Sequence, residues 1–164
     1  QLTAACQILL AVEAAALHQR WLTERPQDYS PQVLMRLQNG LAIPGVTYLE
    51  TMRWRGLALA AHVAATAAVD AVLAPVAPVA APTIADSDVG NSSGAGAVLQ
   101  RLTRFTRPIN YLGVPSLAIP AGFTRTGLPV GMQLIGRSFD EATLLRIGAA
   151  FQRATDFHDK MPAR

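Results

Sequence analysis

The sequence contains almost no lysine and few residues that could form a disulfide or bind a metal. Its only lysine is Lys160, near the C-terminus. A single cysteine, Cys6, excludes an internal disulfide. The three histidines (His18, His62 and His158) are too far apart in the sequence to suggest a metal-binding pattern. We therefore predict no metal site.

Charged residues are also scarce, at 15% of the sequence, whereas hydrophobic residues make up 51%. This composition argues against disorder, and 164 residues can form a domain with a sizeable core. So apolar a chain is typical of a fragment whose natural surface is partly an interface with absent sequence. The net charge of +3 comes from scattered arginines, of which only Arg101 to Arg107 form a cluster. Because nucleic-acid sites gather basic residues on one face, with aromatic residues among them, we predict no nucleic-acid binding.

No stretch of about twenty residues forms an uninterrupted apolar run, so we predict no membrane span. Leu2 to Leu17 is apolar, but it lacks the basic start of a signal peptide and contains Glu13. We therefore expect a cytoplasmic protein. Because Gln1 is not an initiator methionine and the chain begins inside a helical pattern, we expect a fragment of a longer protein.

Residues 1–69 have the pattern of three helices. Apolar residues at helical spacing predict the first helix over Thr3–Thr23. Ser30 is a candidate N-cap for a second, short helix, and Gly40 a candidate stop signal after it. Thr47 and Glu50 form a capping box that predicts a third helix, ending at about Val69. The stripe expected to be buried on this helix consists of Leu49, Met52, Leu57, Ala61, Val63 and Ala64.

Residues 70–164 have the pattern of strands and helices, with a long loop at 78–97. Asp70–Pro75 is a candidate buried strand, and Val98–Leu112 a candidate helix that Pro108 breaks. Ser116–Pro120 and Val130–Ile135 are candidate strands joined by a hairpin-like turn at residues 125–127. The predicted fold is α/β, with a partly antiparallel sheet covered by helices.

A second capping box, Ser138 to Glu141, predicts the last helix, which runs through Gln152. The core stripe of this helix is predicted from its apolar positions, namely Leu144, Leu145, Ile147, Ala150 and Phe151.

The segment from Phe105 to Gly136 carries the most specific pattern. Its spaced positions are Asn110, Gly113, Pro115, Pro120, Gly122, Gly127, Pro129, Gly131, Gln133 and Gly136. Most of these residues serve architecture, since glycine permits positive φ or close approach and proline confines strand ends. Together they closely resemble the C-terminal part of the amidase signature family, and looser similarity extends over nearly the whole chain.

That resemblance implies an α/β fold of which residues 1–164 form the C-terminal portion, with a mixed sheet covered by helices. It implies a complete enzyme that hydrolyses a carboxamide to carboxylate and ammonia through an acyl-serine. The reaction would use a Ser–Ser–Lys triad and no metal or cofactor. The implied partners are a small-molecule amide, the missing N-terminal catalytic portion and, in a homo-oligomer, a second copy of the chain.

No catalytic residue is predicted in this chain. Gly90–Gly96 looks like the family's Gly/Ser-rich signature, but in the family that signature lies well upstream of the region matched here. Ser92 and Ser93 also lack a buried neutral lysine as a base. We expect Lys160 to be exposed and paired with Asp159.

Two residues are predicted to bear on the substrate. In glutamine-using relatives, the A subunits of tRNA-dependent amidotransferases, an arginine pairs with the substrate carboxylate, and Arg36 holds that position here. A structural salt bridge is an equal alternative for Arg36. The same relatives hold the substrate ammonium with an aspartate, where this chain has Thr103. We therefore favour an amidase over an amidotransferase A subunit, with a non-catalytic interaction module as a third interpretation.

Overall fold

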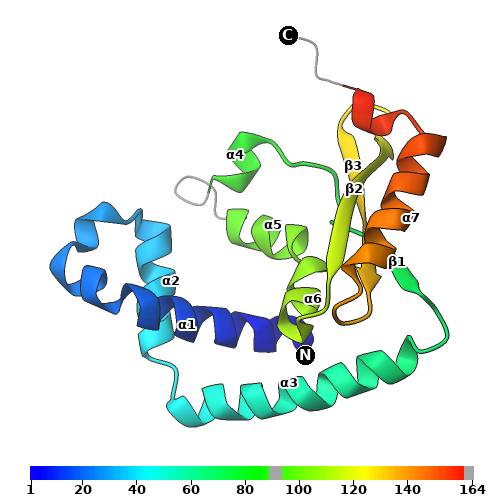
Figure 1. The fold of residues 1–164 in the computed structure, drawn as a ribbon. Helices are drawn as coiled ribbons and strands as arrows, with labels where there is room; N and C mark the ends of the chain where they lie inside the picture. The colour runs from blue at the N-terminus through cyan, green and yellow to red at the C-terminus, as the bar shows by residue number, and fades with distance from the viewer. Residues whose placement is uncertain (89–93, 161–164) are drawn as a thin grey trace.

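The computed structural model describes residues 1–88 and 94–160, and Figure 1 shows their arrangement. The helices and strands follow in the order α1 (Leu2–Glu24), η1 (Pro26–Asp28), α2 (Pro31–Leu41), α3 (Gly45–Ala65), β1 (Ala71–Pro75), α4 (Ile84–Ser87), α5 (Ala95–Leu102), α6 (Thr106–Leu112), β2 (Ser116–Phe123), β3 (Pro129–Gly136), α7 (Glu141–Ala154) and η2 (Phe157–Asp159). In Figure 1, α1 and α2 lie on one side of the molecule and the sheet with α7 on the other, α6 lies between them, and α3 runs along the bottom from α2 toward β1.

Helix α2 crosses α1 at Gly40, a residue whose predicted role was wrong. Gly40 lies inside α2 and is buried, and a Cβ there would overlap the backbone carbonyl of Ala11. The glycine is needed for close helix contact, and the helix continues to Leu41. Ser30 is the N-cap residue as predicted, although its side chain makes no capping hydrogen bond.

Helix α1 is long and apolar enough, by length and composition alone, to cross a membrane, with a mean hydropathy of 1.3 over its most apolar window. In the structure it packs against α2, α3 and α6. One such helix is weak grounds for a membrane assignment, because core helices of soluble proteins and signal sequences near an N-terminus pass the same test.

Helix α3 begins earlier and buries a different face than predicted. Its N-cap is Pro44, and the N–H of Thr47 donates to the carbonyl of Pro44 at 3.0 Å, so Thr47 and Glu50 form no capping box. Thr51 is its buried residue, because α3 meets α1 and α6 only along a narrow face. The members of the predicted stripe instead face outward: Leu49 is 56% exposed, Met52 36%, Leu57 71% and Val63 52%, and Ala61 and Ala64 are exposed as well.

The sheet contains three strands in the order β1-β3-β2, and both described pairings are antiparallel. β2 and β3 form the predicted hairpin, whose turn is closed by a bond of 3.0 Å from the N–H of Gly127 to the carbonyl of Thr124. Gly127 has a φ of 83°, which favours glycine. The described residues thus contain only the antiparallel part of the sheet that the resemblance implies.

Helices cover both faces of the central strand β3. On one face α7 packs against β2 and β3, around Leu134 and Leu144. On the other face Ile135 packs with residues of α6 and with Val114. β1 lies at one edge of the sheet and is only partly covered, with Leu73 63% exposed, so the prediction of a buried strand was wrong.

The segments on either side of the sheet differ locally from their predictions. Within the predicted loop 78–97, α4 forms and α5 begins at Ala95, while residues 89–93 lie outside the described part. The break in the next helix falls at residues 103–105 and not at Pro108. Pro108 is in the first turn of α6, where a backbone N–H has no intrahelical partner to lose.

Helix α7 begins at Glu141, and the predicted capping box at Ser138 does not form. Asp140 is the N-cap position, and the hydroxyl of Thr143 donates to its Oδ1 at 2.7 Å. In the predicted stripe Leu144 is 2% exposed but Leu145 is 61% exposed, because α7 buries only the side that faces the sheet. Ile147 and Phe151 pack against the core, and Ala150 is exposed.

Candidate functional site

The buried side chain of Gln133 joins three segments that converge behind the hairpin. Its Nε2 donates to the carbonyl of Pro75 at 3.0 Å and to that of Phe105 at 3.3 Å. Its Oε1 accepts from the hydroxyl of Ser116 at 3.2 Å. Gln133 is 3% exposed, so these bonds satisfy a polar group that would otherwise be costly to bury. The sequence marked Gln133 by its place in the motif but gave no indication of this role.

At the C-terminus of α6, Gly113 adopts a left-handed φ of 75°, and its N–H donates to the carbonyl of Ile109. A Cβ on Gly113 would overlap the guanidinium of Arg55, which therefore lies directly against this turn. The adjacent hydroxyl of Tyr111 donates to the carbonyl of Thr51. Burial raises the pKa of Tyr111, and the charge of Arg55 partly opposes that rise.

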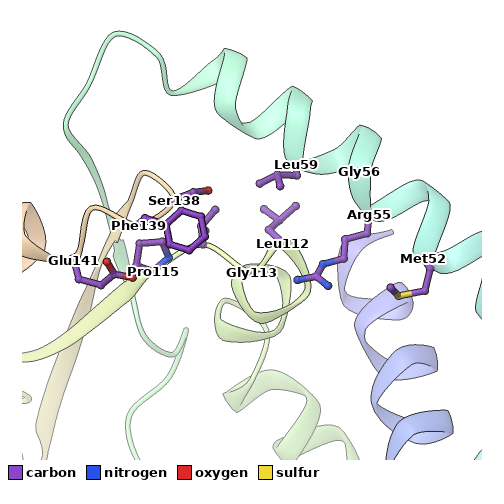
Figure 2. A pocket seen from close by; sticks show the side chains of 11 residues that line it. Met52, Arg55, Gly56, Leu59, Leu112, Gly113, Pro115, Ser138, Phe139 and Glu141 are labelled. Carbon is purple, nitrogen blue, oxygen red and sulfur yellow. The ribbon is translucent and has the colours of Figure 1, made fainter.

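Arg55 and Gly113 line a hollow of about 500 Å³ between α3, the α6–β2 connection and the β3–α7 loop (Figure 2). Its walls are mixed, since apolar side chains of α3 and α6 face Glu141 and Ser138. Phe139 and Arg55 lie on opposite sides of it in Figure 2. The sequence did not predict this hollow, which forms from three segments distant along the chain.

The two predicted substrate residues lie on different helices. Arg36 is exposed on α2, and it makes no hydrogen bond or ion pair with the described residues. Thr103 follows α5 as its C-cap residue, and its hydroxyl donates to the carbonyl of Leu99 at 3.0 Å. Neither residue lines the hollow beside Gly113 or two further hollows between described residues, so their role in substrate binding stays a prediction.

The surroundings of Thr103 are cationic. Arg101 and Arg104 are exposed on either side of it, and Arg107 follows in the next helix. Nη1 of Arg107 is buried without a hydrogen-bond partner among the described residues. Burial raises the pKa of the nearby Cys6 thiol, and the charge of Arg107 opposes this in part. A raised pKa makes Cys6 a poor nucleophile.

The described residues also show how Lys160 is held. Its Nζ lies 3.2 Å from Oδ2 of Asp156, and not beside Asp159 as predicted, because η2 turns the chain back. The same ammonium lies over the rings of Phe123 and Phe157, 5.7 and 5.9 Å from their centres. These contacts tie Lys160 to the far end of the hairpin. Ser92 and Ser93 lie outside the described residues.

No group of three or more His, Cys, Asp or Glu residues in the described ranges could hold a metal ion. The absence of a cofactor stays a prediction from the resemblance. The described residues provide a hydrogen-bonded hairpin, an arginine-rich connection between α5 and α6, and open hollows.

Comparisons with known proteins show which family has this sequence and fold. Residues 4–145 match the sequence model of the Amidase family. The A subunit of glutamyl-tRNA(Gln) amidotransferase from Chloroflexus aggregans (strain MD-66 / DSM 9485) is 65% identical over 57 residues, which are 35% of this chain and 12% of that protein. The corresponding protein from Streptococcus sanguinis (strain SK36) is 45% identical over 82 residues, 50% of this chain and 16% of that protein.

A crystal structure of an amidase superposes on 94% of this chain with a TM-score of 0.84 and 30% sequence identity. The chain covers 35% of that amidase, so it spans about a third of the solved relative. Since the family match extends over most of the sequence and the fold agrees, this chain belongs to the amidase signature family and covers part of its fold.

Proposed function

We propose that this chain is the C-terminal third of an amidase, a hydrolase of carbon–nitrogen bonds whose Ser–Ser–Lys triad lies in sequence outside the chain. The observation that carries the proposal is the superposition on 35% of a solved amidase. The contacts of Lys160 support it, since a lysine that is ion-paired and stacked on two rings is poorly suited to act as a base.

In this proposal the chain supplies one wall of the acyl pocket, and the reaction produces a carboxylate and ammonia. The arginine-rich connection around Thr103 favours a neutral amide as substrate. Residues 99–112 contain three arginines and no Asp or Glu, so a substrate ammonium would meet repulsion there. Amides without an α-ammonium group should therefore be preferred over glutamine.

The test is the substrate preference of the complete enzyme, measured as kcat/KM for glutamine and for a neutral amide. An α-ammonium left unpaired in a partly dry site costs about 1–3 kcal/mol. This corresponds to roughly tenfold to over a hundredfold in specificity. Thr103→Asp should shift the preference toward glutamine, whereas Thr106→Asp should shift it less if Thr103 alone holds the ammonium position. A wild-type enzyme that prefers glutamine would contradict the assignment.

A second candidate is a fragment of an amidotransferase A subunit. It is favoured by the 65% identity over 57 residues to such a protein, the glutamyl-tRNA(Gln) amidotransferase of Chloroflexus aggregans. The same kcat/KM comparison separates the two candidates, because the amidotransferase would use glutamine and need partner subunits. The third interpretation, a non-catalytic interaction module, predicts no hydrolysis with any preparation.

A further inference from the structure

We propose that Phe139 and the adjoining hollow form a docking surface for the part of the amidase domain that this chain lacks. This inference rests on the proposed function. Phe139 has two independent unusual features, a left-handed backbone conformation and an exposed aromatic ring.

Phe139 is the third residue of a four-residue turn. The N–H of Asp140 donates to the carbonyl of Arg137 at 3.1 Å and closes the turn. Phe139 has a φ of 63°, which makes it the one described non-glycine residue with a left-handed φ. Glycine or asparagine is usual at such a turn position, and a bulky residue there is an outlier.

The ring of Phe139 offsets none of this strain within the chain, since the residue is 96% exposed. Backbone outliers persist where surrounding contacts impose them. Because the described chain provides so few contacts for the ring, we infer that the compensating contact comes from a group outside it. An exposed aromatic side chain beside a hollow is also typical of the anchor residues that contribute most to binding at protein interfaces.

The hollow continues the same surface onto α3. Met52, Gly56 and Leu59 line it at helical spacing, and Leu49 extends the row by one further turn. Leu49 and Met52 are 56% and 36% exposed. Figure 2 shows Phe139 opposite Arg55 across this hollow. The guanidinium of Arg55 makes no hydrogen bond or ion pair with the described residues, so it is able to donate to an oxygen of an occupant.

The occupant that fits is the remainder of an amidase signature domain, because the chain covers only 35% of the solved amidase on which it superposes. The cores of protein interfaces are enriched in aromatic, methionine and arginine side chains. This surface contains all three types, in Phe139, Met52 and Arg55. The occupant should present apolar side chains to Phe139 and a carboxylate or carbonyl oxygen to Arg55. A second copy of the chain is the competing occupant.

The first measurement compares the isolated wild-type chain with Phe139→Asn, which tolerates a left-handed φ and lacks the ring. Ile84→Asn is the matched control, since Ile84 is 90% exposed and does not line the hollow. We expect the melting temperature of Phe139→Asn to equal or exceed that of the wild type. A fall of more than about 2–4 °C would show that the ring belongs to the chain's own core and would overturn the proposal.

The second measurement co-expresses each variant with a tagged version of the part of the crystallised amidase that this chain does not cover, and quantifies the chain captured and its amide hydrolysis. Phe139→Asn should lower capture at least about tenfold, as loss of an anchor does, whereas Ile84→Asn should leave it unchanged. Equal capture of both variants, or no capture of the wild type, would overturn the docking surface. Capture of the wild type without hydrolysis would instead contradict the proposed function alone.

Sedimentation of the isolated chain tests the competing occupant. A dimer that is abolished by Phe139→Asn but retained by Ile84→Asn would show that a second copy covers this surface. That result would overturn the choice of the amidase remainder as occupant. A wild-type chain whose association is unaffected by Phe139→Asn is the expected result.

Discussion

β3 and α3 differ in how much of their surface this chain covers. β3 is covered by α7 on one face and by α6 on the other, and its residues Gln133 to Gly136 are all buried. α3 buries one narrow strip and leaves leucines, valines and a methionine in water. The sheet side therefore packs around a core of its own, whereas the helical side leaves large apolar side chains exposed.

The largest effect should come from a cavity in the core between the sheet and α7. Leu144→Ala should lower the free energy of unfolding by about 2–5 kcal/mol, because it removes a buried side chain whose space cannot collapse. The neighbouring Leu145→Ala should change it by about 0.5 kcal/mol or less, since Leu145 is 61% exposed. Urea unfolding of both variants measures this difference. Equal losses of unfolding free energy in the two variants would show that α7 packs against the sheet with a different face.

An intermediate effect is expected at the polar junction behind the hairpin. Gln133→Leu leaves the carbonyls of Pro75 and Phe105 without their side-chain donor, and should destabilise the chain by about 1–3 kcal/mol. Ser116→Ala removes only the hydroxyl bond to Gln133 at an exposed position and should cost less. A Gln133→Leu variant as stable as the wild type would mean that these bonds do not hold the junction together.

The smallest effect on stability, and the clearest on association, should follow changes on the outer face of α3. Val46→Gln with Leu57→Gln should alter the free energy of unfolding by about 0.5 kcal/mol or less, because both side chains are mostly exposed and neither lines the hollow beside Phe139. The wild-type chain should self-associate through its apolar face and unpaired strand edges, and the double variant should do so less. Sedimentation velocity at increasing concentration measures both. A wild-type chain that remains a monomer would contradict the view that the exposed apolar face of α3 promotes association.

Local patterns in the sequence predicted the longer helices and the hairpin, because helical spacing and turn chemistry act over a few residues, whereas the short α4 was missed. The family came from the resemblance of the Phe105–Gly136 segment. The capping boxes at Thr47 and Ser138 failed because tertiary context began each helix elsewhere. The buried face of α3 was not predicted, since apolar residues are spread around much of that helix and its contacts with α1 and α6 decide which of them are covered.

The candidate site was less predictable than the fold. The hollow beside Phe139 depends on segments far apart in sequence, and the left-handed φ of Phe139 leaves no local signal in a position where glycine is usual. The bonding of Gln133 likewise appears only once β1, β2 and the α5–α6 connection meet. Arg36 and Thr103 came from the family resemblance, and their role awaits a substrate measurement.

The most direct test of the account is amide hydrolysis by the purified chain alone, against a panel of simple aliphatic and aromatic amides. We predict no turnover, because the chain has no lysine suited to the triad. Turnover that survives Ser92→Ala and Ser93→Ala but is lost with Lys160→Ala would contradict the assignment of Lys160. Turnover lost with either serine variant would place the nucleophile in this chain and contradict the central claim that the triad lies outside it.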